Sequence, residues 1–415
     1  MWRQLQIEDW VKGRKASLAD VKAPVEDIIS QVRGHGDAAL KDLTAKFDKV
    51  QLDDLRITKE QMRAAREKVS PQLIADLEKA AANVRRFHQL QRQGDVWFKE
   101  VEPGIILGVK TTPLERVGCY VPGGRASYPS TVIMCAVPAK VAGVRQVVLC
   151  TPPPVNPLTL VAMDVAGVDE AYMVGGAQAI AAMALGTETI RPVHKIVGPG
   201  NVFVTMAKML LRDVVDIDFP AGPSEIAVIA DSSADPVYIA ADILAQAEHD
   251  PNSACVLISA DPSLPDKVGK EIDRQLQMSN RKAILEKSLS NTGYILANDI
   301  DEAAMISDRL APEHLSLQVS NELRALNAVH NAGSIFIGRY AAVACGDYAS
   351  GTNHILPTAG FARMFSGLDV HHFCKRSSLQ MIDRTGLESI GGTVSRLADA
   401  EGLEAHARSV RLRME

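Results

Sequence analysis

The sequence has no long apolar run, little cysteine and no long block of basic charge. Its apolar stretches stay well short of the roughly 20 residues that a membrane-spanning helix needs. No apolar core follows the first four residues, so no signal peptide is visible. The formal net charge is −5, which argues against nucleic acid as the main partner. We therefore expect a cytoplasmic protein that binds neither membrane nor nucleic acid.

The cysteines are few and scattered, and none forms a C-x-x-C pair. Most stand among apolar neighbours, which favours buried free thiols in a reducing compartment over a disulfide or zinc-thiolate framework. The six positions are Cys119, Cys135, Cys150, Cys255, Cys345 and Cys374.

The length and the hydrophobic pattern predict several domains of the α/β class. A chain of 415 residues, 47% hydrophobic, is too long for one ordinary core. The first part reads as helical, with a capping box at Thr58-Lys59-Glu60-Gln61. From Val96 short apolar strands alternate with helices, which predicts parallel sheets with right-handed crossovers.

The alternation occurs twice. Expected strands at 117–121, 146–150 and 171–174 are followed by a second set at 225–230, 254–259 and 293–297. We therefore predict an α/β fold of two related Rossmann-like lobes, each incompletely doubly wound, with helical N-terminal and C-terminal segments. The expected domains are 1–105 (helical), 106–223 (first lobe), 224–366 (second lobe) and 367–415 (a helical arm).

One segment concentrates more chemistry than a connector needs. The run Gly346-Asp347-Tyr348-Ala349-Ser350-Gly351-Thr352-Asn353-His354 reads as a loop after an apolar strand at 334–337. Loops that gather polar groups beside a rigid scaffold tend to carry function. This run is therefore the first candidate site.

Two further pairs of side chains are candidates for metal binding and proton transfer. Gln246 and His249 are three residues apart at the end of an expected helix, so an amide oxygen and an imidazole share one face. Glu313-His314 is a plausible proton-transfer pair near neutral pH. Each pair alone is more often an ordinary surface feature. Asp347 and His406 would complete a mixed N/O set that suits zinc, and also cobalt or manganese.

The glycine-rich segments give a weaker indication of a dinucleotide site. Gly34-His35-Gly36-Asp37-Ala38-Ala39 fits G-x-G-x-x-A, but it lies between expected helices and reads as a helix end and turn. Three other segments border expected strands or helices, where glycine lets backbone approach a phosphate. They are Pro122-Gly123-Gly124, Gly175-Gly176-Ala177-Gln178 and Gly198-Pro199-Gly200-Asn201.

Taken together, these motifs closely resemble the histidinol dehydrogenase family, in order and in spacing, over roughly residues 20 to 410. The segments that carry the resemblance are Glu115-Arg116-Val117-Gly118-Cys119-Tyr120-Val121-Pro122-Gly123-Gly124, Val174-Gly175-Gly176-Ala177-Gln178-Ala179, Gly198-Pro199-Gly200-Asn201, Pro220-Ala221-Gly222-Pro223-Ser224-Glu225, Ala245-Gln246-Ala247-Glu248-His249, Pro312-Glu313-His314-Leu315 and the run 346–354.

The resemblance implies an enzyme of histidine biosynthesis that uses one Zn²⁺ per subunit and two molecules of NAD. Such enzymes oxidise L-histidinol to L-histidine through an aldehyde, as homodimers in which the terminal segment reaches the partner's site. By motif match, the implied metal ligands are Gln246, His249, Asp347 and His406, and the catalytic pair is Glu313 and His314. The implied substrate contacts are Ser224, His354 and Glu401 together with the metal ligands and His314, and the implied cofactor contacts are Tyr120, Gln178 and Asn201.

The chemistry of the residues agrees with this assignment. Oxidation of an alcohol needs a base for the hydroxyl proton, which suits His314, and a hydride acceptor, which suits NAD. The second step adds water to the aldehyde, and Glu313 can help to deprotonate that water.

Two positions depart from the family pattern. Arg125 follows the double glycine, where small residues are usual, and either contacts a cofactor phosphate or faces water. His371 and His372 stand where an acidic residue commonly precedes the Phe-x-Lys-Arg pattern, which residues 373–376 keep.

Two other functions compete with this assignment. A paralogue that oxidises another polar alcohol, such as a sulfonated diol, should keep the metal and the Glu-His pair. Glu401 argues against it, because a carboxylate would repel an anionic substrate. A non-catalytic zinc-binding scaffold is disfavoured by the intact pair of Glu313 and His314.

Overall fold

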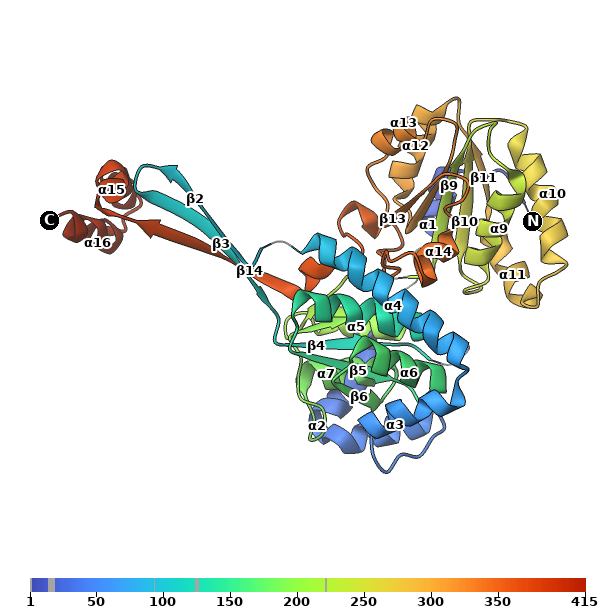
Figure 1. Cartoon of the computed structure of the whole chain (residues 1–415), viewed down its shortest axis with the longest axis horizontal. Coiled ribbons are helices and arrows are strands. Elements are labelled where there is room, and N and C mark those ends of the chain that lie inside the picture. The colour runs from blue at the N-terminus through green and yellow to red at the C-terminus, as the bar shows by residue number, and fades with distance from the viewer. Residues whose placement is uncertain (1, 14–18, 93, 124–126, 221) are drawn as a thin grey trace. The chain divides into compact units, whose positions relative to one another are not determined.

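The computed structural model describes residues 2–13, 19–92, 94–123, 127–220 and 222–415. These form two compact units, the first made of Met1–Gln91 with Glu115–Phe373 and the second of Arg92–Leu114 with Cys374–Glu415 (Figure 1). Gly124 and Arg125, singled out above, lie outside the described residues.

The first unit contains a six-stranded sheet in the order β1-β6-β5-β4-β7-β8. All neighbours in it are parallel except β1, which runs antiparallel to β6 at the edge. Its strands are β1 (Arg56–Ile57), β4 (Arg116–Tyr120), β5 (Gln146–Thr151), β6 (Glu170–Met173), β7 (Lys195–Val197) and β8 (Asp216–Ile217).

A second sheet in the same unit has five parallel strands in the order β11-β10-β9-β12-β13. Its strands are β9 (Glu225–Ala230), β10 (Ala254–Ser259), β11 (Gly293–Leu296), β12 (His314–Gln318) and β13 (Ser334–Ile337). Counted from β4 and from β9, both sheets have the strand order 3-2-1-4-5 of a Rossmann-like half. The prediction of two related Rossmann-like lobes is confirmed.

Helices follow the strands in each lobe and build the layers seen in Figure 1. The helices of the first lobe are α5 (Pro129–Ala142), α6 (Pro157–Ala166), α7 (Gly176–Leu185) and α8 (Val202–Leu210). Those of the second lobe are α9 (Pro236–Ala247), α10 (Leu264–Leu276), α11 (Lys282–Ser288), α12 (Ile300–Leu310), α13 (Glu322–Ala328) and α14 (Val343–Tyr348). The N-terminal helices are α1 (Ile7–Gly13), α2 (Lys22–Phe47), α3 (Lys59–Ala64) and α4 (Pro71–Gln91).

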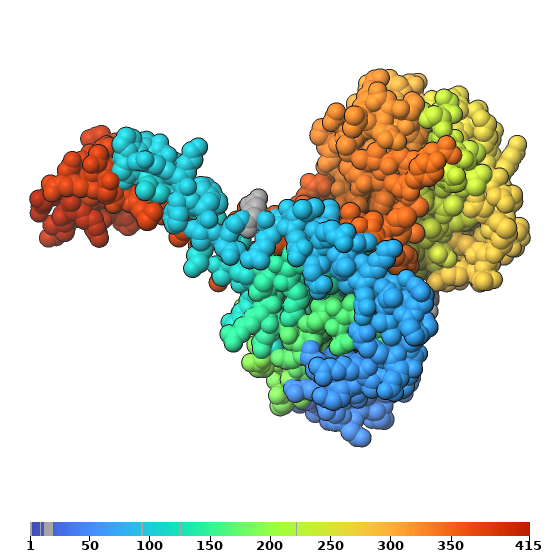
Figure 2. All heavy atoms as spheres, viewed as in Figure 1, coloured from blue at the N-terminus to red at the C-terminus, as the bar shows by residue number. Residues whose placement is uncertain are grey.

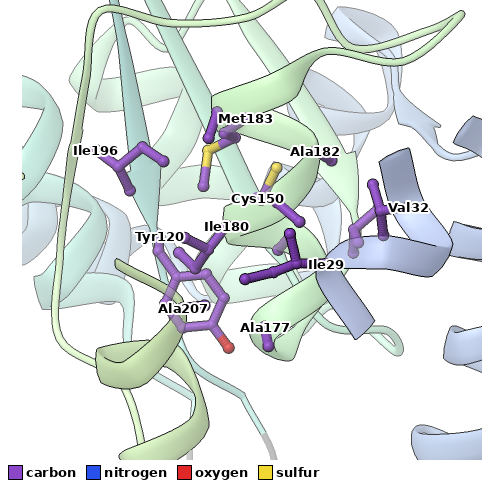
Figure 3. Packing of buried hydrophobic residues seen from close by; sticks show 14 of the residues in the cluster. Ile29, Val32, Tyr120, Cys150, Ala177, Ile180, Ala182, Met183, Ile196 and Ala207 are labelled. Carbon is purple, nitrogen blue, oxygen red and sulfur yellow. The ribbon is translucent and has the colours of Figure 1, made fainter. Parts of the chain in front are cut away.

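The N-terminal helix α2 belongs to the core of the first lobe. Its apolar residues recur at helical spacing, which places Ile29 and Val32 on one buried face. That face packs with Tyr120 and Cys150 of the sheet and with α7 (Figure 3). Gly36 has φ +49° and kinks the helix, so the glycine segment read as a helix end and turn is a break within α2.

The expected capping box at Thr58 is confirmed at the start of α3. The Thr58 hydroxyl accepts from Gln61 N, and the Gln61 side chain accepts from Thr58 N. This fixes the entry of the chain into α3 directly after β1.

The second unit is a three-stranded antiparallel sheet with two helices. Strand β3 (Ile105–Pro113) lies between β2 (Val96–Glu102) and β14 (Cys374–Ile382), and α15 (Arg384–Ala400) and α16 (Glu404–Met414) follow. The segment from 367 was expected to be helical, and its part that forms β14 is instead a strand. Most of β14 is exposed on both faces, so its sequence shows no buried alternation, and its pairing with β3 is non-local.

Apolar side chains lie on the surface of the second unit. Figure 2 shows the residues of β2 and β3 in cyan and those of the C-terminal helices in red. The large exposed apolar side chains here include Trp97, Phe98, Val101, Met381, Leu397 and Leu412.

All six cysteines are free thiols. Four are buried, as expected, whereas Cys345 is exposed and Cys374 is partly buried. Within the part of the chain that the structure describes, no helix is long and apolar enough to cross a bilayer.

Candidate functional site

The acid–imidazole pair lies at the start of β12. His314 is the first residue of that strand, beside Ile226 of β9, and Glu313 immediately precedes it. Successive side chains within a strand point to opposite faces, but Glu313 stands before the ladder begins. Its Oε2 lies 3.5 Å from His314 Nδ1. Both residues are buried, so the two groups share one desolvated site.

The imidazole of His314 has a defined orientation. Nδ1 lies 3.1 Å from the carbonyl oxygen of Glu225 and 3.2 Å from the amide nitrogen of Gln246. Because a carbonyl only accepts, Nδ1 carries a proton, and Nε2 is the ring position that gains or loses the second proton. Nε2 is buried, has no hydrogen-bond partner among the described residues and lies 3.7 Å from Asp347 Oδ1. A buried ring nitrogen left open in this way is a site for a ligand atom or a proton.

The charges around this ring shift two pKa values in opposite directions. Burial lowers the pKa of His314, but the carboxylates of Glu313 and Asp347 outweigh it and raise that pKa to about 10. Burial likewise raises the pKa of Asp347, yet His314, His354 and His249 together hold it below its usual value. Asp347 is therefore an ionised, buried oxygen donor at neutral pH.

Asp347 lies on the short helix α14, so the expectation that residues 346–354 form a loop is wrong for the first three of them. Asp242 of α9 accepts a hydrogen bond from Val343 N at the start of α14, and burial raises the pKa of Asp242 to about 6. Sequence reasoning missed Asp242. It connects the helix that carries Gln246 to the helix that carries Asp347.

The rest of the 346–354 segment is held by helices α4 and α5. Asn83 of α4 donates to Ala349 O at 2.8 Å, and Asn353 donates to Met134 O of α5 at 2.8 Å. His354 donates from Nδ1 to the carbonyl of Asp347 at 3.0 Å, and its Nε2 lies 3.5 Å from Thr131 Oγ1. The segment is therefore anchored at Ala349, at Asn353 and at His354 itself. No local signal in the sequence indicates these partners.

The other candidate metal ligands differ in their surroundings. Gln246 is buried in the last turn of α9, whereas His249 is exposed and lies just beyond the end of that helix. His406 and Glu401 are exposed residues of the second unit, on α16 and at the end of α15. Among the described residues, no group of three or more His, Cys, Asp or Glu side chains is close enough to hold a metal. The first unit brings together Gln246, Asp347 and His314, and it places the charge of His249 near Asp347.

The candidate cofactor residues follow the carboxyl ends of the first sheet. Tyr120 ends β4, and its buried hydroxyl accepts a hydrogen bond of 3.0 Å from Gly176 N at the start of α7. Asn201 begins α8 by accepting from Phe203 N and Val204 N. Gln178 is buried in the first turn of α7. Strands β4 and β7 flank the point where the strand order reverses, which is where α/β sheets bind dinucleotides.

Two Rossmann-like lobes, one of which carries a buried acid–imidazole pair, are typical of an α/β dehydrogenase-type enzyme. Comparison with known proteins identifies the family. The histidinol dehydrogenase family model matches residues 11–414. The histidinol dehydrogenase of Methanosarcina barkeri is 52% identical over 405 residues, covering 97% of this chain and 94% of the relative. That of Vibrio parahaemolyticus is 45% identical over 422 residues, covering 100% and 98%.

A solved structure agrees. The crystal structure of histidinol dehydrogenase from Elizabethkingia anophelis has a TM-score of 0.95 and 37% identity, covering 99% of this chain and 96% of that one. The chain belongs to the histidinol dehydrogenase family and is an oxidoreductase.

Proposed function

We propose that this chain is a zinc-dependent, NAD-linked enzyme that oxidises L-histidinol through L-histidinal to L-histidine, in the biosynthesis of histidine. The observation that supports this most directly is the free, buried Nε2 of His314. It lies 3.7 Å from Asp347 Oδ1, while Glu313 stands beside the other ring nitrogen. A base and a second acid in one desolvated site are what two successive oxidations need.

The neutral form of His314 would take the proton of the substrate hydroxyl, and NAD⁺, when bound, would supply the hydride acceptor that the oxidation to the aldehyde needs. Glu313 would then accept a proton from the water that adds to the aldehyde. A second NAD⁺ would supply the acceptor for the oxidation of this hydrate to the carboxylate. Glu313 and His314 are both buried, which keeps the reactive aldehyde away from bulk water.

The donor set fits zinc in kind. Asp347 supplies an ionised oxygen, Gln246 an amide oxygen and His249 an imidazole, and all three approach one end of α9. His406 supplies the fourth ligand. Zinc, when bound, would hold the amino and imidazole nitrogens of the substrate and fix its geometry. Ser224, His354 and Glu401 complete the substrate contacts, and the metal ligands and His314 also face the substrate.

Tyr120, Gln178 and Asn201, at the carboxyl edge of the first sheet, would hold NAD, which would supply the hydride acceptor. Burial raises the pKa of Tyr120 to about 12, so the phenol stays neutral at physiological pH. Its oxygen accepts from Gly176 N and thereby holds the start of α7, a helix end that favours phosphate.

We further propose a homodimer in which His406 and Glu401 act in the partner's site. Both residues are exposed on the second unit, whose surface carries Trp97, Phe98 and Leu397. An apolar surface of this kind is expected to be covered by a second copy of the chain. The free thiols fit a reducing compartment, so we expect the enzyme in the cytoplasm.

An NADH assay with L-histidinol tests the proposal. We expect two NADH per substrate, loss of activity with chelator and recovery when zinc is added back. A sulfonated diol is the control substrate. Faster turnover of the diol, or one NADH per L-histidinol, would contradict the assignment.

A further inference from the structure

A buried ion pair lies beneath the loop that leads into α8. Lys208, in the last turn of α8, approaches Asp218, which follows β8, with Nζ and Oδ1 2.7 Å apart. Their side chains are 4% and 1% exposed. Taking two charges out of water carries a large desolvation cost, so the pair is weak evidence for stability alone. Its partners indicate another role.

Both polar backbone groups of Gly198 are bound by this pair. Asp218 Oδ2 accepts from Gly198 N at 2.8 Å, and Lys208 Nζ donates to Gly198 O at 2.6 Å. Asp218 Oδ1 also accepts from Phe219 N at 2.8 Å. The pair therefore satisfies both backbone hydrogen-bonding groups of Gly198, as a neighbouring strand would, and it holds that glycine from one side.

Gly198 has little freedom on its other side. Its φ is +116°, a conformation that L side chains rarely adopt, and a Cβ there would come 2.1 Å from Tyr120 O. The glycine backbone is thus pressed between the end of β4 and the ion pair. Three residues further on, Asn201 caps α8 and places the start of that helix.

We propose that Lys208 and Asp218 are positioning residues that hold the Gly198–Asn201 loop in the shape that binds the dinucleotide. This inference rests on the dinucleotide site proposed above. Lys208 and Asp218 belong to the first lobe, whereas the proposed proton-transfer residues, Glu313 and His314, belong to the second. The ion pair should therefore set the affinity for NAD and NADH and leave the chemical step at saturating NAD nearly unchanged.

A second ion pair, between β7 and β8, offers a matched control. Lys195 Nζ lies 2.8 Å from Asp216 Oδ2, which pairs the first residues of β7 and β8. Lys195 is also largely buried, at 9% side-chain exposure, whereas the hydrogen bonds to the backbone of Gly198 come from Lys208 and Asp218. Lys195→Met removes an ion pair from the same sheet without touching the loop.

The experiment measures NADH binding by fluorescence, and NAD kinetics with L-histidinol, on the zinc-loaded full chain. We expect Lys208→Met to raise the Kd for NADH and the KM for NAD by about tenfold and to leave kcat within about twofold of the wild type. This is the pattern of a change that weakens binding of the ground state and the transition state equally. Asp218→Asn keeps the size of the side chain but turns an amide N–H toward Gly198 N. It should likewise weaken NAD and NADH binding while leaving kcat nearly unchanged, and it should speed amide hydrogen exchange at residues 198–204. Lys195→Met should change neither constant by more than about twofold.

Wild-type NADH affinity in either Lys208→Met or Asp218→Asn would overturn the inference, as would an equal loss in Lys195→Met. A wild-type protein that does not reduce NAD with L-histidinol would instead contradict the proposed function. The two failures are distinguishable, because the first leaves wild-type turnover intact.

Discussion

Glu225 and Glu313 hold each other through reciprocal hydrogen bonds across β9 and β12. Glu313 Oε2 accepts from Glu225 N at 2.9 Å, and Glu225 Oε1 accepts from Glu313 N at 3.2 Å. The carbonyl of Glu225 also accepts from His314 Nδ1 at 3.1 Å. One residue of β9 therefore sets the position of both members of the proposed catalytic pair.

This arrangement predicts that Glu225→Ala lowers kcat while Glu225→Gln largely preserves it. Alanine leaves the buried N–H of Glu313 without its acceptor, which costs roughly 1–3 kcal/mol and frees the pair to move. Glutamine keeps an acceptor oxygen at the same reach. Steady-state kinetics with L-histidinol, beside thermal unfolding of both variants, checks this. Equal kcat for the alanine and glutamine variants would show that Glu225 has no positioning role.

His314→Asn is expected to reduce turnover by about 10³-fold, the usual contribution of a positioned base. The fold should persist, because the ring makes few polar contacts beyond Glu225 and Gln246 and its Nε2 has none among the described residues. The measurement is NADH formation together with the circular dichroism spectrum. Full NAD reduction by a folded variant would eliminate His314 as the base.

Asp242 predicts a pH-dependent stability of definite sign. Its pKa is raised from 3.8 to about 6 by burial, so folding disfavours the charged form. The contribution of Asp242 to stability is therefore fully present below the pKa that this carboxyl has in the unfolded chain. It is lost as the pH rises through 6. The corresponding change in the free energy of unfolding is roughly 3 kcal/mol.

We therefore expect Asp242→Asn to be more stable than the wild type at pH 7.5 and to lose this advantage at pH 4. Asparagine keeps an oxygen that can accept from Val343 N. Urea unfolding at both pH values measures the difference, and Asp213→Asn, on an exposed turn, is the control. A stability difference that does not depend on pH would contradict the role of burial at Asp242.

The parts of this molecule that could be predicted from sequence are those with a local signal. Strands β9 and β10 have the predicted bounds, because buried parallel strands are short continuous apolar runs. The family motifs likewise indicated the acid–imidazole pair before its geometry was known. These features depend on residues that lie close together in the sequence.

The features that escaped prediction depend on residues distant in the sequence. Strand β14 exists because β3 pairs with it, and Asp347 sits on a helix whose start is capped by Asp242 of α9. The anchoring of Asn353 by Met134 O and the clamp of Lys208 and Asp218 on Gly198 are also tertiary contacts. Sequence spacing gives no measure of such contacts, which is why buried polar partners were the least predictable part of the site.

The proposed sharing of His406 between subunits predicts complementation. His406→Asn and Glu313→Gln are each expected to be nearly inactive as homodimers. In a heterodimer with trans sharing, the terminal segment of the Glu313→Gln chain still carries His406. It would complete the active site of the His406→Asn chain, in which Glu313 is intact. Random exchange makes about half of the dimers mixed, each with one intact site of two, so about a quarter of wild-type activity should return.

The control for this experiment mixes His406→Asn with Glu401→Gln. Both changes lie in the same terminal helices, so every site in such a heterodimer receives one defective arm and no activity should return. Activity is measured as NADH formation after subunit exchange, which differently tagged chains verify by co-purification. Absence of recovery in the first mixture would place His406 in the site of its own chain, whereas recovery in both mixtures would show that His406 and Glu401 of one chain serve different sites.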